Sequence, residues 1–187
     1  MTSKEPLERG SGLIALRIYI QKRYGTVGEK EILSKLPEDT VKVYNEAITH
    51  EWYPVRHTRI LLDALYEKSG KDDSVILEVA AAQAQTDVKG IVRFLVLFAT
   101  PHQLVKRSSK LWSQYVNAGK MRYEKLASRS CEIIREGYSN GPLDCLMVAG
   151  FMKELASFTG AKNVEVTETE CVEKGAKACR WKITWNP

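Results

Sequence analysis

The feature that most constrains the fold is a change in hydrophobic period near Gly119. Before it, apolar residues recur at helical spacing, as in GLIALRIYIQKRYG, a helix predicted to end at Gly25, and in HQLVKRSSKLWSQYVNAG. After it, alternation in SCEIIREG, NVEVTETEC and KACRWKITW predicts strands, and PLDCLMVAGFMKELASFTG returns to helical spacing. The order of elements predicts an α+β fold, in which a helical N-terminal part packs on an antiparallel sheet of about four strands.

The chain length of 187 residues suits a single domain spanning 1–187. The N-terminal stretch MTSKEPLERGSG lacks the apolar middle of a signal peptide. The longest apolar run, GIVRFLVLFAT, is too short to span a bilayer and contains Arg93. We therefore expect a soluble cytoplasmic protein without membrane insertion, in which paired cysteines favour metal or redox roles over disulfides.

The charge pattern is weakly basic, with a net charge of +5 from 28 basic and 23 acidic residues. Its densest basic stretch, LVKRSSK, lacks the interleaved aromatics of a nucleic-acid surface, so we expect a solvated face and no nucleic-acid partner. The chain shows no nucleophile elbow, phosphate loop, dinucleotide fingerprint or paired acid–base motif. These absences argue against an enzyme.

The densest cluster of reactive groups is VTETECVEKGAKAC, in which Cys171 and Cys179 lie equally far on either side of Gly175. If the flanking strands pair around Gly175, the two cysteines face each other, which suits either a disulfide or a shared metal ion. A redox switch and chance spacing are the other interpretations.

Two thiolates alone make a poor zinc site, because structural zinc takes four ligands. Glu168 lies three residues before Cys171, and Cys145 lies in the preceding helix, whose connection can bring it back over the hairpin. Cys131, in an earlier strand, is left over. Three thiolates and a carboxylate suit zinc, a tetrahedral and redox-silent ion.

The spacing Cys145-x22-Glu168-x2-Cys171-x7-Cys179 resembles the zinc site of the 4-vinyl-reductase domain. That domain is the effector-sensing module of bacterial aromatic-responsive transcription activators and also occurs near bacteriochlorophyll synthesis genes. The resemblance implies that Cys145, Glu168, Cys171 and Cys179 hold a structural zinc ion. Four protein ligands leave no open position for an activated water, so zinc catalysis is not expected.

The first half has its own resemblance, carried by YGTVGEKEILSKLP, HEWYP and LWSQYVNAG. These segments resemble a domain family of unknown function that is abundant in myxobacteria. That family is similar in fold to heme-based nitric-oxide sensors, to the 4-vinyl-reductase domain and to Bet3-type subunits of vesicle-tethering complexes. Together the two resemblances cover nearly the whole chain.

A heme site is the first implication to weigh, because His102 follows Pro101. The heme sensors carry a Tyr-x-Ser-x-Arg motif for the propionates, and neither YEKLASR nor GYSNG fits it. We therefore expect no heme, and we expect His50, His57 and His102 to be structural or surface residues.

A ligand pocket is the second implication, because the effector pocket of the 4-vinyl-reductase family lies between helices and sheet. The aromatic candidates for its lining are Phe94, Phe98, Trp112, Tyr123 and Phe151, with plain core packing as the alternative for each. A face of small residues, Ala80, Ala81, Ala82 and Ala84, predicts that one helix approaches the sheet closely.

These features favour a non-enzymatic sensory domain that binds a small apolar or aromatic ligand and signals through a protein partner or a homodimer. One alternative is a protein-interaction module of the Bet3 type, and a weaker one is an accessory factor in tetrapyrrole metabolism. A sensor should contain an apolar pocket with convergent polar groups, whereas an interaction module should expose an apolar patch.

Overall fold

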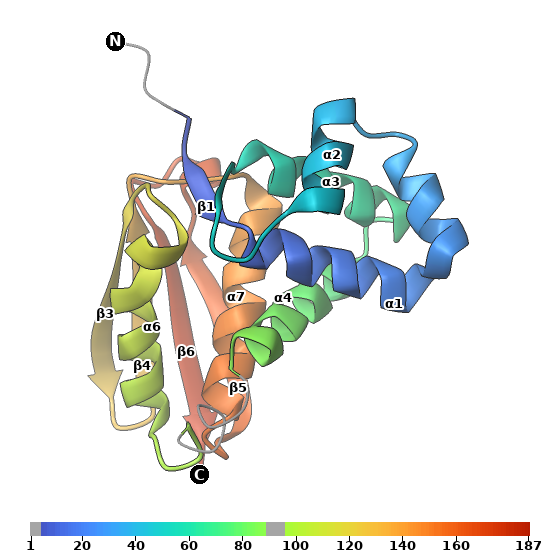
Figure 1. Cartoon of the computed structure of the whole chain (residues 1–187). Helices are drawn as coiled ribbons and strands as arrows, with labels where there is room; N and C mark the ends of the chain where they lie inside the picture. The colour runs from blue at the N-terminus through green and yellow to red at the C-terminus, as the bar shows by residue number, and fades with distance from the viewer. Residues whose placement is uncertain (1–4, 89–95) are drawn as a thin grey trace.

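The computed structural model describes residues 5–88 and 96–187, which form a helical part and a four-stranded antiparallel sheet (Figure 1). The helices in these ranges are α1 (Ser11–Leu33), α2 (Glu38–Glu46), α3 (Arg56–Lys68), α4 (Asp73–Asp87), α6 (Pro101–Tyr115) and α7 (Pro142–Ser157). The sheet is ordered β3-β4-β6-β5, with β3 at Lys120–Ala127, β4 at Ser130–Glu136, β6 at Cys179–Asn186 and β5 at Lys162–Glu170. The predicted α+β class and the sheet of four antiparallel strands are confirmed.

The first helical segment of α1 ends at Gly25, as its hydrophobic spacing predicts. Gly25 has a φ of 61° and a ψ of −173°, which are not helical, so α1 consists of two helical segments that meet at a kink, and the second runs to Leu33. Glycine adopts this positive φ at little cost because it lacks a Cβ atom.

A second, two-stranded sheet joins β1 (Leu7–Arg9) to β2 (Trp52–Pro54). Neither strand was expected, because three residues are too few to show a hydrophobic period. The HEWYP segment supplies β2. The backbone of Glu8 in β1 also bridges to Val116, just beyond α6, which ties β1 to the segment between α6 and β3.

Helix α7 lies between the sheet and the N-terminal helices and contributes to both parts of the core (Figure 1). Met152, Leu155 and Ala156 pack with the inward face of the sheet. Leu146 and Met147 pack with α1 and its neighbours. Within the described residues, no helix combines the length and apolarity needed to cross a bilayer.

The sheet presents one face to the core, as the two-residue period of a strand requires. In β6 the buried residues are Cys179, Trp181, Ile183 and Trp185, which alternate with exposed Lys182 and Asn186 and partly exposed Arg180 and Thr184. In β4 the same alternation turns Arg135 inward, directly opposite Cys179 in the strand register.

The small-residue face of α4 packs against α7 and not against the sheet, which corrects the sequence-based expectation. Ala80 and Ala84 are fully buried in this contact. A Cβ atom built on Gly150 of α7 would lie 2.8 Å from the Ala80 Cβ and 3.0 Å from the Leu77 carbonyl oxygen. The two helices therefore meet where neither has room for a larger residue.

Gly150→Ala should destabilise the protein by about 1–3 kcal/mol, because the added methyl group overlaps α4. Gly12→Ala in helix α1 is the matched control, because a Cβ atom built on Gly12 would lie no closer than 3.7 Å to any neighbouring atom. Alanine is up to about 1 kcal/mol better than glycine in a helix, so the control should be neutral or stabilising. Urea denaturation measures both, and a Gly150→Ala protein as stable as the parent would contradict the close contact.

Candidate functional site

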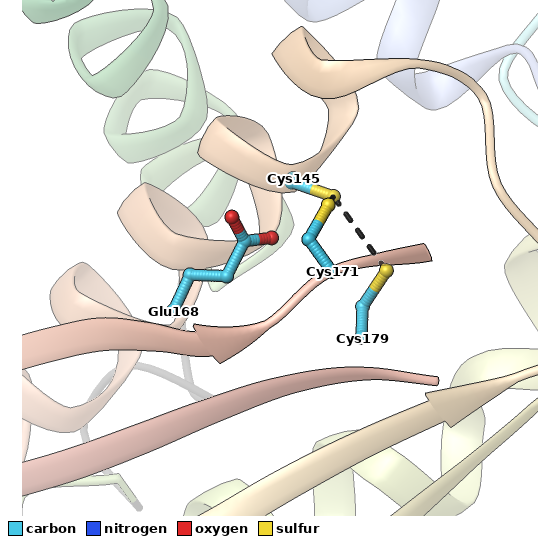
Figure 2. A group of neighbouring side chains, drawn as sticks. All are labelled: Cys145, Glu168, Cys171 and Cys179. Atoms are coloured by element: carbon cyan, nitrogen blue, oxygen red, sulfur yellow. Dashed lines mark hydrogen bonds between the residues drawn. The ribbon is translucent and has the colours of Figure 1, made fainter. Parts of the chain in front are cut away.

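The four predicted metal ligands come from three elements and meet at one end of the sheet. Cys145 lies in the first turn of α7, which begins at Pro142, and Glu168 lies on the inward face of β5. Cys171 follows β5, and Cys179 begins β6. Figure 2 shows the three sulfur atoms and the Glu168 carboxylate directed toward one another.

The distances among these side chains fit a shared ion. The Sγ atom of Cys145 lies 3.7 Å from that of Cys171 and 3.8 Å from that of Cys179. One ligand atom from each of the four residues lies within 4.8 Å of the others. Tetrahedral bonds of about 2.3 Å to zinc separate two sulfurs by about 3.8 Å, whereas a disulfide needs about 2.05 Å. The cysteines are free thiols, and their spacing suits a shared metal ion better than a disulfide.

A tight turn holds the two hairpin cysteines in place. After Cys171 the chain forms a short 3₁₀ helix, Val172–Lys174, and Gly175 then takes a φ of 90°. Within this turn the Val172 N–H donates to the Cys179 sulfur at 3.4 Å. Backbone donors of this kind stabilise thiolates at metal sites and fix their orientation.

The two carboxylate oxygens of Glu168 have different surroundings. Its Oε2 forms an ion pair with Lys174 and accepts a hydrogen bond from Lys174 Nζ at 3.2 Å. Its Oε1 is buried and has no hydrogen-bond partner in the part of the chain that the structure describes. A surface hollow of about 240 Å³, lined by Glu168, Thr169, Glu170, Cys171, Lys174 and Ala176, adjoins the cluster and offers an entry path for an ion.

Arg135 supplies the positive charge beside this cluster, and its guanidinium is fully buried. Its Nη2 donates to Cys145 Sγ at 3.5 Å and to Cys179 Sγ at 4.0 Å, while Nη1 donates to Asp144 Oδ2 at 2.6 Å. Burial disfavours the charged form, but Asp144 and the two thiols outweigh it and raise the pKa of Arg135. Three thiolates and a carboxylate around a divalent ion leave excess negative charge, which Arg135 is placed to offset.

Two of the cluster thiols, those of Cys145 and Cys171, have raised pKa values, which favours their protonated forms when no metal is bound. Burial raises the pKa of Cys145, Arg135 lowers it in part, and Glu168 raises it further. Burial likewise raises the pKa of Cys171. A metal ion would therefore displace protons from these thiols as it binds.

The second feature is a cavity of about 770 Å³ between the N-terminal helices, α6 and α7. Its apolar walls include Leu104, Leu111, Met147, Val148, Phe151 and Met152. Of the predicted ligand contacts, Trp112 and Phe151 line it, and Phe98 lines it while remaining 76% exposed. Phe94 lies outside the described residues. Tyr123 is not among the lining residues, and its hydroxyl binds His102 Nδ1 at 2.7 Å.

The three histidines lie apart from one another. His102 Nε2 donates to the Ser128 carbonyl oxygen at 3.0 Å, so Nδ1 accepts the Tyr123 hydroxyl proton. His57 is buried with its Nδ1 3.0 Å from Thr40 Oγ1, and burial lowers its pKa. His50 is exposed.

One end of the cavity is polar, and sequence reasoning missed it. Glu8, Thr58 and Asp144 line this end. Although Glu8 as a residue is partly exposed, its Oε1 is buried, and neither this atom nor the buried Thr58 Oγ1 forms a well-aligned hydrogen bond with the described residues, although the two side chains lie close together. Burial raises the pKa of Glu8 to about 8, the Thr58 hydroxyl offsets part of the shift, and Asp144 adds to it.

Comparison with known proteins identifies the fold. No protein-family model and no curated protein matches the sequence. Among solved structures, an H-NOX protein from S. oneidensis in the Fe(II)NO ligation state has a TM-score of 0.71 and 14% identity over 96% of this chain and 99% of that one. An Fe(II) unliganded H-NOX protein from K. algicida has a TM-score of 0.71 and 12% identity over 96% and 97% of the chains. An oxygen-binding H-NOX domain related to soluble guanylate cyclases has a TM-score of 0.70 and 13% identity over 96% of this chain and 95% of that one.

The chain therefore has the fold of the H-NOX domains, which confirms the predicted similarity in fold to heme nitric-oxide sensors. The structures from S. oneidensis and K. algicida are of Fe(II) states, and a further match at 14% identity concerns heme distortion in the H-NOX family. The expectation that no heme belongs with this chain is therefore wrong, because it relied on the spacing of one motif and not on the fold. The resemblances to the 4-vinyl-reductase domain and to the myxobacterial family stay predictions.

The buried Glu8 carboxyl should make stability depend on pH. Its folded-state pKa, about 8, lies above the ordinary value of 4.5, so its contribution is present below pH 4.5 and is lost as pH rises toward 8. Glu8→Gln should remove this decline, which amounts to at most about 1.4 kcal/mol per pH unit. Unfolding free energies of both proteins across this range measure it. Glu46→Gln, at an exposed carboxyl on α2, should leave the decline unchanged, and identical curves for Glu8→Gln and the parent would contradict the assignment.

Proposed function

We propose that this protein is a non-enzymatic sensory domain that binds a small apolar or aromatic molecule in the 770 Å³ cavity. The cavity carries this proposal, because its volume lies within the roughly 300–1,000 Å³ range of small-molecule sites and its walls are mostly apolar. Signalling would pass through a protein partner or a homodimer.

The alternative of a Bet3-type interaction module has less support. Such a module should expose a contiguous apolar patch. The large exposed apolar side chains in the described ranges are spread over α1, β2, α6, β3 and connecting segments: Ile18, Val27, Ile48, Trp52, Leu97, Phe98, Tyr115 and Leu126. Phe98 is both exposed and a lining residue, so it belongs to the rim of the cavity.

The cysteine cluster is proposed to hold a structural zinc ion, with Cys145, Glu168, Cys171 and Cys179 as its ligands. The sulfur spacing and the unpartnered Glu168 Oε1 support this assignment. Four protein ligands close the coordination sphere, so the ion would stabilise the fold and would not activate water.

The zinc ion would also stiffen one wall of the cavity. It would tie the first turn of α7 to the β5–β6 hairpin, and Met147, Phe151 and Leu155 of the same helix line the cavity. A wall that is already rigid loses little conformational entropy when a ligand binds, which favours affinity.

A heme-holding sensor is the second candidate, favoured by the likeness to H-NOX structures and by the size of the cavity. Among the described lining residues, Met121, Met147, Met152, Tyr115 and Tyr138 have side chains of types that bind heme iron in proteins. His102 begins the helix that forms one wall, with its ring bound to Tyr123 and Ser128. A bound heme would supply a gas-binding iron, and these residues are the ones that would hold it.

Zinc content tests the metal assignment. Protein purified without added metal should contain about one zinc per chain by elemental analysis. Replacing Cys145, Cys171 or Cys179 by Ser should abolish zinc binding and lower the melting temperature, because structural zinc is coupled to folding. Glu168→Gln should weaken zinc binding less, since three thiolates remain.

Cys131→Ala is the matched control for zinc binding. Cys131 is fully buried in the sheet core and lies outside the cluster, so this variant should lose some stability but keep its zinc. A metal-free parent protein, or zinc lost from Cys131→Ala and kept by Cys145→Ser, would contradict the assignment.

A ligand screen tests the cavity. Aromatic alcohols, fatty acids and porphyrins should be compared by thermal shift, and hemin also by its Soret absorbance. A ligand at a hundredfold excess over its Kd should stabilise the fold by about 2.7 kcal/mol. Met147→Trp, which fills the cavity, should abolish the shift and keep the zinc, while Val27→Trp, at an exposed position on α1, should change neither. A shift that survives Met147→Trp would place binding elsewhere.

A further inference from the structure

The polar end of the cavity is built from elements that are far apart in the sequence. Glu8 comes from β1, Thr58 from α3 and Asp144 from the first turn of α7, and all three line the cavity. Glu8 Oε1 and Thr58 Oγ1 are buried without hydrogen-bond partners in the described ranges. The Thr58 hydroxyl lies close enough to Glu8 to lower its pKa, but the two oxygens form no well-aligned hydrogen bond. Buried polar atoms are nearly always paired, so this end of the cavity indicates a bound group that completes their hydrogen bonding.

Two carboxyl groups, Glu8 and Asp144, lie at this end, and no basic side chain of the described residues is paired with Glu8. Arg135 is engaged by Asp144. Arg9, although it lines the cavity, donates to the carbonyl oxygens of Gln114 and His50 and stacks 4.1 Å from the centre of the Trp52 ring. Asp144 is the charged group that acts on Glu8, and it is of the same sign.

We propose that the ligand carries a protonated amine, which donates hydrogen bonds to Glu8 Oε1 and Thr58 Oγ1 while its apolar body lies between Trp112 and Phe151. This inference rests on the proposed function of the cavity. An ammonium group has several donors and one positive charge, so it satisfies both orphan oxygens and neutralises Glu8. A hydroxyl group has one donor and no charge, and a carboxylate would be repelled by Glu8 and Asp144.

The proposal has a second signature in proton release. The empty cavity keeps much of Glu8 protonated near neutral pH, because burial raises its pKa to about 8. An ammonium group favours the ionised carboxylate, so binding should expel part of a proton from the protein. The other ionisable groups around this end are Asp144 and Tyr138, with Arg135 behind them and Asp87 and Arg107 elsewhere on the wall.

The test uses one ring system with different side-chain ends. Binding of tryptamine, tryptophol, indole-3-acetate and 3-ethylindole to the whole protein is measured by calorimetry at pH 7.4. Tryptamine should bind at least about tenfold more tightly than tryptophol, a difference of about 1.4 kcal/mol, and indole-3-acetate should bind most weakly. Repeating the tryptamine titration in buffers of different ionisation enthalpy should show proton release.

Glu8→Gln keeps the shape of the side chain and removes its charge. It should erase both the tryptamine preference and the proton release, leaving tryptophol affinity within about threefold, because the neutral hydrogen bond is retained. Glu46→Gln, at an exposed position, should behave as the parent protein. If Glu8→Gln does not fold, Thr58→Val is the second variant, and it should weaken tryptamine more than 3-ethylindole.

Tryptophol or indole-3-acetate binding as tightly as tryptamine would overturn the inference, as would a preference for tryptamine that survives Glu8→Gln or Thr58→Val. If 3-ethylindole binds and tryptamine binds no better, the cavity is a ligand site and only the amine assignment fails. If none of the four compounds binds, and the wider ligand screen also finds nothing, the proposed function fails with it.

Discussion

The ion pair between Arg135 and Asp144 is the interaction on which both parts of the site depend. Arg135 is fully buried on β4, and Asp144 lies in the first turn of α7, so the pair joins the sheet to the central helix. A buried guanidinium is tolerated only when it is paired, and removing one partner of such a pair costs about 3–5 kcal/mol. The aromatic rings of Trp112, Tyr138 and Trp181 surround the cation, which limits its other partners to Asp144 and two cysteine sulfurs.

Helix α7 connects this ion pair to the cysteine cluster, to helix α4 and to the cavity. Its first turn carries Cys145 for the cysteine cluster, its middle carries Gly150 for the contact with α4, and its later turns line the cavity. A helix with such different neighbours must be apolar nearly all round, as the PLDCLMVAGFMKELAS sequence is. Its apolar character therefore reflects its central position, and its few polar residues mark the sites.

The fold and the cysteine cluster could be predicted from the sequence, because both depend on the spacing of residues along the chain. Periods of 3.6 and 2 predicted the helices and the main sheet, and the intervals between Cys145, Glu168, Cys171 and Cys179 predicted that the four would meet. Alternation in SCEIIREG places Arg135 on the same face as Ile133, but arginine is so rarely buried that the pattern alone does not predict its burial.

The polar end of the cavity could not be predicted from the sequence. Glu8 lies in a strand of three residues within a polar stretch, and its neighbours Thr58 and Asp144 are distant in sequence. Only the tertiary fold brings them together. The partner of the small-residue face of α4 was wrongly predicted for a similar reason: small residues predict a close contact but do not show which element makes it.

Asp144 and Cys145 are consecutive residues, yet one lines the cavity and the other belongs to the cysteine cluster. Arg135 binds both side chains, so a change at either place alters the electrostatic potential at the other. Thermodynamic linkage makes such an influence reciprocal: a ligand that strengthens metal affinity is itself held more tightly, by the same factor, when the metal is present. If the cluster holds zinc and the cavity holds a ligand, as proposed, the availability of zinc in the cell would shift the concentration at which the domain responds to its ligand.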